Sequence, residues 1–150
     1  MAQINTAALQ SDISKYLRSY AIAYASAAAT FGPLIAKQAI ADFYGSYDPV
    51  EYIRTENLLN NSCSRYYHNN GDIVYGGVRI HSGNMNEYIG GGWDAATVAK
   101  QTWTAGRHGN VHTYPPLSMA AMALGQIEPK CKIIGETTAL SQKYSVLKFA

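Results

Sequence analysis

Apolar side chains recur every three or four positions through the first 45 residues, which is the pattern of one long amphipathic helix. The residues that share this face are Leu9, Ile13, Tyr16, Leu17, Tyr20, Tyr24, Ala27, Phe31, Leu34 and Ile35. Ser11, Lys15 and Arg18 lie on the opposite face. Pro33 lacks a backbone N–H and should kink the helix near Gly32. The apolar phase continues across it, so we predict one bent helix.

The pattern changes after Gly45, which is expected to end this helix, and Pro49 prevents its early resumption. A loop and a short helical turn are predicted for residues 48–61.

Two strands are predicted next, at residues 63–68 and 72–81, because aromatic and β-branched residues are frequent there. The Asn69-Asn70-Gly71 sequence between them suits a tight turn, since Asn and Gly tolerate positive φ. Gly76-Gly77 suggests a β-bulge in the second strand.

The second half of the chain is less regular. Residues 82–92 are polar and glycine-rich and are expected to form an exposed, mobile loop. A helix is predicted for residues 94–105, with Asp94 as its N-cap. Residues 106–116 are expected to be irregular.

The apolar run of residues 117–124 suits a short helix. Residues 130–150 are ambiguous, with helix possible at 136–143 and a strand at 144–149. The chain is therefore predicted to be a single α+β domain: a long bent N-terminal helix on a small antiparallel sheet, with one or two further short helices.

Composition favours contact with other proteins. Charged residues make up only 15% of the chain, which contains 13 Gly and 12 Tyr, whereas soluble domains usually carry about 25% charged residues. Tyrosine offers a large apolar area and one hydroxyl at low entropic cost, as protein interfaces require. A monomer with these aromatics in its core is the alternative.

The net charge of +2 is too small to argue for nucleic-acid binding by itself. Lys130, Lys132, Lys143 and Lys148 outnumber Glu136 near the end of the chain, which suggests a solvated tail more than a basic face near DNA. Eighteen uncharged residues separate Arg18 from Lys37, but they are mostly small or polar, so a transmembrane span is rejected.

Catalytic and metal-binding patterns are weak. Cys63 and Cys131 are expected to be free thiols, consistent with a reducing cytoplasm. His108 and His112 have helical ligand spacing, but Gly109 and nearby prolines disfavour a helix, and no carboxylate lies close in sequence. No phosphate-binding glycine motif is present. No catalytic residue, metal ligand or cofactor is predicted, and a small Cys/His hydrolase remains a minor alternative.

The predicted hairpin carries aromatic residues among basic ones, at residues 65–68 and at Tyr75, Arg79 and His81. Such a mixture can bind single-stranded nucleic acid. Cross-strand packing of the aromatics is the simpler interpretation.

Residues 43–55, with the sequence FYGSYDPVEYIRT, resemble the aromatic YY-x-x-Y-x-P-x-x-Y-x-RT segment of tail-completion (head–tail joining) proteins of tailed phages. Phe43 replaces the first tyrosine, and residues 58–62 match the leucine–serine stretch that follows. Downstream, residues 103–109 resemble the family's aromatic-then-Gly-x-His-Gly element, and residues 115–119 its proline-rich continuation. The resemblance covers about residues 8–120.

The resemblance implies a non-enzymatic structural virion protein at the neck, where the head joins the tail. It implies a ring of subunits, commonly six, that contacts neck, head-connector and tail-tube or terminator proteins and encloses a lumen through which viral DNA could pass. A tail-terminator role is the close alternative. The chain would be located in the virion and, during assembly, in the host cytoplasm, with no membrane partner.

Two sets of residues follow from the motifs. The first is a structural corner between the long helix and the sheet, formed by Tyr44, Tyr47, Pro49, Tyr52, Arg54 and Thr55. In it, Arg54 can stack on a ring and Thr55 can cap the following helical turn. The second is a candidate interface: Trp103, His108, Gly109, Pro115, Pro116 and Met119. The loops at 82–92 and 106–116 are expected to contact neighbouring subunits or rings.

Overall fold

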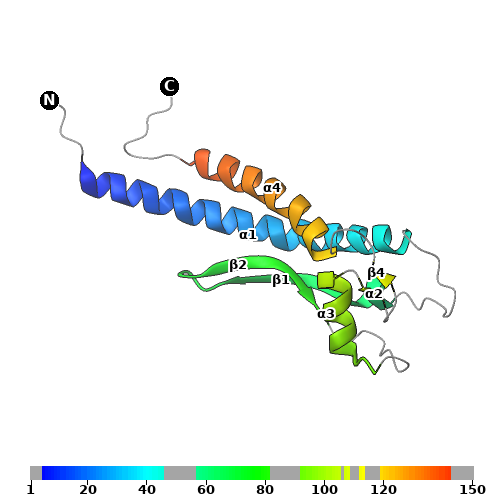
Figure 1. Ribbon diagram of the computed structural model, residues 1–150. Helices are drawn as coiled ribbons and strands as arrows, with labels where there is room; N and C mark the ends of the chain where they lie inside the picture. The colour runs from blue at the N-terminus through cyan, green and yellow to red at the C-terminus, as the bar shows by residue number, and fades with distance from the viewer. Residues whose placement is uncertain are drawn as a thin grey trace.

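In the computed structural model, one long helix lies between a second helix and a β-hairpin (Figure 1). The structure describes residues 5–45, 57–81, 92–105, 107–108, 112–113 and 119–142. The helices are α1 (Thr6–Gly45), α2 (Asn57–Asn61), α3 (Ala95–Ala105) and α4 (Met119–Leu140). The strands are β1 (Cys63–Asn69), β2 (Val74–Ile80), β3 (Arg107–His108) and β4 (His112–Thr113). The predicted α+β architecture is confirmed.

Helix α1 begins at an N-cap. The Asn5 side-chain Oδ1 accepts a hydrogen bond from the backbone N–H of Ala8, at 3.0 Å. The helix ends at Gly45, as predicted, and continues through Pro33 without interruption. The single long helix is therefore confirmed.

Two faces of α1 are buried, whereas the sequence pattern predicted one. The predicted aromatic face covers α4: Tyr24 and Phe31 pack around Ala27, Ala28 and Cys131. The second face is made mostly of alanine and glycine, with Ile40 and Phe43 near the end of the helix, and it lies against the hairpin and α3. Its buried members are Ala25, Ala29, Gly32, Ala36, Ala39, Ile40 and Phe43.

The predicted apolar face is wrong at three positions. Ile13, Leu17 and Leu34 are 49%, 57% and 64% exposed. The buried surface follows alanine and glycine instead, because only short side chains allow a strand to lie close against a helix backbone.

The hairpin of β1 and β2 agrees with the two predicted strands. Their antiparallel register runs from the Cys63–Ile80 pair to the Asn69–Val74 pair. The predicted turn is also confirmed. Gly71 has φ 96°, and the Asn70 side-chain oxygen accepts the backbone N–H of Ile73 at 2.8 Å.

The predicted bulge at Gly76-Gly77 is absent, because both residues pair one-to-one, with Tyr67 and Tyr66 respectively. Gly76 serves a different purpose. A Cβ there would collide with the backbone carbonyl of Ala25 on α1, whereas a Cβ on Gly77 would meet nothing within 4 Å. Glycine at 76 therefore permits the close approach of β2 to α1.

Helix α3 is capped as predicted. The Asp94 Oδ1 accepts the backbone N–H of Thr97 at 2.7 Å. Hydrogen bonds from the Thr97 side chain and backbone lower the pKa of Asp94. The helix places Ala99 and Trp103 in one core cluster with Ala36, Ile40 and Phe43 of α1.

Helix α4 is much longer than the predicted short helix at 117–124. It has 22 residues and passes through Pro129. It lies along α1 (Figure 1), with Ile127 beside Gly32 near its start and Gly135 against the ring of Tyr20 farther on. Packing of Cys131 and Ile134 against α1 outweighs the poor helix propensity of proline and glycine.

Within residues 106–116, expected to be irregular, the structure shows a short antiparallel pair of β3 and β4. The predicted loop at 82–92, apart from Gly92, lies outside the described residues, as do the predicted strand at 144–149 and most of the corner at 46–56. None of the described helices is long and apolar enough to cross a membrane.

Candidate functional site: the outer face of the hairpin

The register divides the hairpin into two faces. Gly76 and Val78 point toward α1, because they approach Ala25 and Gly32. Side chains alternate along a strand, so Tyr75 and Arg79 point away from α1. Their cross-strand partners, His68 and Ser64, lie on the same outer face, as does Tyr66 opposite Gly77. We call this surface, formed by Ser64, Tyr66, His68, Tyr75, Gly77 and Arg79, the outer face.

Four side chains of the outer face form one continuous stack. The Arg79 guanidinium lies over the Tyr66 ring, with its Cζ 4.4 Å from the ring centroid. Tyr66 stacks on Tyr75 at 5.3 Å between centroids, and Tyr75 stacks on His68 at 5.0 Å. The stack therefore runs across both strands in the order Arg79, Tyr66, Tyr75, His68.

Hydroxyl groups belong to this stack. A side-chain hydrogen bond with Tyr66 is the main cause that raises the pKa of Tyr75, and Arg79 opposes the shift. The outer face therefore offers aromatic rings, two tyrosine hydroxyls and one guanidinium. These are the groups that protein interfaces use as anchors.

A serine–histidine pair lies at the base of the same face. Ser64 Oγ and His81 Nε2 are 2.6 Å apart, and the backbone N–H of His81 donates to the carbonyl of Ser62 at 2.8 Å. Efficient activation of a serine by such a pair needs a further group that orients the histidine. Among the residues that the structure describes, no carboxylate contacts His81. The pair links the ends of β1 and β2.

The two thiols are poor nucleophiles. Burial raises the pKa of Cys63, and the hydrogen bond with Ser62 only partly opposes it. Burial also raises the pKa of Cys131, which lies between α4 and α1. Both thiols therefore stay protonated near neutral pH, so the geometry offers the Cys/His hydrolase alternative no activated cysteine.

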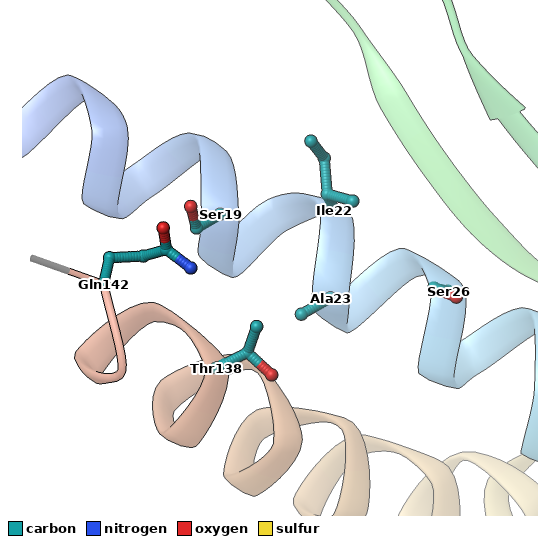
Figure 2. Close-up of a pocket in the computed structure, with 6 residues that line it drawn as sticks. All are labelled: Ser19, Ile22, Ala23, Ser26, Thr138 and Gln142. Atoms are coloured by element: carbon teal, nitrogen blue, oxygen red, sulfur yellow. The ribbon is translucent and has the colours of Figure 1, made fainter.

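A hollow of about 370 Å³ lies between α1 and α4 (Figure 2). Its lining residues are Ser19, Ile22, Ala23, Ser26, Thr138 and Gln142. The Gln142 amide and Thr138 extend toward Ser19 and Ala23 across the gap, whereas Ile22 points away. Among the described residues, the lining offers hydroxyl and amide groups but no ionisable group that could carry acid–base chemistry.

The predicted corner is described only at Tyr44. This residue lies in the last turn of α1 and packs against the core cluster of Ile40 and Phe43. Tyr47, Pro49, Tyr52, Arg54 and Thr55 lie outside the described residues.

The structure describes three of the six predicted interface residues, and they lie on three different elements. Trp103 is 6% exposed and lies in the core, and its indole N–H has no hydrogen-bond partner among the residues that the structure describes. His108 pairs with His112 in the backbone register of β3 and β4. Met119 begins α4. Gly109, Pro115 and Pro116 lie outside the described residues.

The structure separates the basic and aromatic residues that the sequence grouped together. Arg65 and Tyr67 lie on the inner face of the hairpin, with the Arg65 Cζ 5.8 Å from the Tyr67 centroid. Because side chains alternate along a strand, the register of the two strands assigns each of these residues to one face of the hairpin. Within the described part of the chain, no group of three or more His, Cys, Asp or Glu side chains could hold a metal ion.

Comparisons with models of known protein families, with curated proteins and with solved structures found no match for this chain.

Proposed function

We propose that the chain is a structural subunit of a tailed-phage virion, located in the neck between head and tail. The sequence resemblance at residues 43–55 and 103–119 suggests the location. The structural observation that supports the proposal most strongly is the outer face, which carries tyrosine and arginine on the side of the hairpin that points away from α1.

The layered arrangement suits a ring subunit. A neck subunit needs one surface for contact with its own copies and another for contact with other virion proteins. The hairpin and α4 lie on opposite sides of α1 (Figure 1). Helix α4 exposes Leu124, Ile133 and Leu140, which supply apolar area on its side. The role is geometric: the ring would close the neck and offer the tail an attachment surface.

The test is the composition and structure of purified virions. We expect mass spectrometry to detect the chain in complete particles, and cryo-electron microscopy to show it as a ring between connector and tail tube. Deletion of its gene should leave DNA-filled heads and unattached tails, and the wild-type gene supplied in trans should restore joining. Complete, infectious particles that lack the chain would overturn the proposal. A ring at the tail side only would assign the tail-terminator role.

A further inference from the structure

We propose that the outer face of the hairpin docks another protein, which presents a carboxylate to Arg79 among apolar groups that cover the tyrosine edges. That this protein belongs to the virion rests on the proposed function. The docking itself rests on the charge and geometry of the outer face.

Arg79 is an exposed cation that lies against one aromatic ring of the outer face. Its side chain is exposed, and it forms no ion pair with any residue that the structure describes. Its guanidinium lies over the Tyr66 ring, with Cζ 4.4 Å from the centroid, and this contact restricts where the group can lie. A stacked guanidinium keeps its N–H donors at its edge, where they match the two oxygens of a carboxylate.

The outer face lacks an internal counter-charge. Its members are serine, tyrosine, histidine, glycine and arginine, with no Asp or Glu. The nearest acidic residue in the hairpin sequence is Asp72, in the turn. A partner with a carboxylate therefore gains an ion pair without displacing one, which is charge complementarity.

The stack is already ordered before binding. Tyr66 and Tyr75 are held by each other, by Arg79 and by His68. Ordering flexible side chains at an interface costs about 0.5–1.5 kcal/mol each, so an ordered stack reduces this cost.

The same geometry disfavours single-stranded nucleic acid. Bases bind by stacking on free aromatic faces, but the tyrosine faces here are covered by neighbouring side chains. Arg65, the other guanidinium of the hairpin, lies on the inner face. One cation on the outer face releases few counterions, whereas nucleic-acid affinity depends on many.

Site-specific photo-crosslinking tests the docking with a matched control. Tyr75 on the outer face and Tyr67 on the inner face are 41% and 37% exposed. Each is replaced in turn by p-benzoylphenylalanine in the full chain, expressed with its genomic neighbours during assembly. We expect irradiation to join the Tyr75 position to one other protein, and the Tyr67 position to give at least about tenfold less of that product, because contact requires the outer face.

Reversing the charge of Arg79, and then that of its partner, tests whether Arg79 forms the ion pair. Arg79→Glu should lower the yield of the product at least about tenfold, the usual scale for breaking an interfacial charge pair. Arg65→Glu on the inner face should leave the yield within about twofold, since exposed charges away from a contact matter little. Replacing the contacted carboxylate of the partner by arginine should restore the yield with Arg79→Glu. Arg79→Lys keeps the positive charge but loses the two parallel N–H donors of the guanidinium, so it should give an intermediate yield. This variant replaces Arg79→Glu if Arg79→Glu does not fold.

The outcomes separate the two proposals. A crosslinked protein that is absent from virions supports the docking and contradicts the neck location. A chain present in virions without an outer-face product contradicts the docking and leaves the neck location standing. A product with nucleic acid, or with a second copy of this chain, overturns the docking proposal, as does a yield that Arg79→Glu leaves unchanged.

Discussion

At the scale of single residues, glycines show most clearly how this fold is specified. Gly76 and Gly77 are neighbours in one strand, yet only Gly76 lies against the backbone of α1. The sequence pattern treated the pair as one feature and predicted a bulge. Only the register, which depends on the position of the hairpin on α1, distinguishes the two glycines.

Gly76→Ala should destabilise the protein by about 1–3 kcal/mol or more, because the new methyl group overlaps backbone that cannot rotate away. Gly77→Ala is the control and should change stability by less than about 1 kcal/mol, since its Cβ enters open space. Denaturant unfolding of both variants measures the difference. Equal effects at the two positions would contradict the close approach of β2 to α1.

The N-cap Asp94 should make the stability of the protein depend on pH in the acid range. Its folded pKa is lowered by the hydrogen bonds from Thr97, so its contribution to stability is present above the unfolded pKa of about 3.9. That contribution is lost as pH falls through the folded pKa. Asp94→Ala should lower the unfolding midpoint at neutral pH. Asp94→Asn keeps a capping oxygen and should remove the acid-dependent part alone. Thermal unfolding of wild type and both variants between pH 7 and 2 distinguishes the capping contribution from the charge contribution. Identical pH profiles for wild type and Asp94→Asn would contradict the lowered pKa of Asp94.

At the scale of elements, sequence periodicity predicted most of what the structure contains. Helix α1, the hairpin, its turn and the capped α3 were all predicted within a few residues. These elements carry local signals: periodicity, an Asn-Gly turn and an N-cap. Helix α4 was underestimated because Gly125, Pro129 and Gly135 interrupt its local signal, while the packing that stabilises it comes from α1. The outer face depends on register between two strands, which no single segment specifies.

The two glycines of α4 should respond oppositely to alanine. Gly125 has open space around it, so Gly125→Ala should stabilise the helix by about 0.5–1 kcal/mol. At Gly135, a Cβ would lie 2.8 Å from the Tyr20 ring, so Gly135→Ala should destabilise the protein despite the better helix propensity. Chemical unfolding monitored by circular dichroism tests the sign of each change. Stabilisation at both positions would show that α4 does not lie against Tyr20.

At the scale of the whole molecule, the thiol of Cys131 is a probe of the packing between α4 and α1. It is fully buried there, and burial raises its pKa. Folding therefore keeps the proton on this thiol, and stability should fall as pH rises above the ordinary thiol pKa of about 8.5.

In a Cys63→Ser variant, the remaining thiol of Cys131 should react with a disulfide reagent far more slowly in the folded protein than in denaturant, because reaction requires α4 to leave α1. A Cys131→Ser variant is the companion that reports on Cys63, which is only partly buried. Reaction of Cys131 at the denatured rate would mean that α4 does not cover it.

The central position of α1 also sets the order in which the chain can be completed during synthesis. The hairpin follows α1 closely in sequence, so α1 and the hairpin can leave the ribosome and pack together early. Helix α4 is synthesised only after residue 118. Until then Tyr20, Tyr24 and Phe31 have no helix to cover them. The growing chain therefore displays an aromatic stripe that the finished protein hides, and a ribosome stalled before α4 presents that stripe to chaperones.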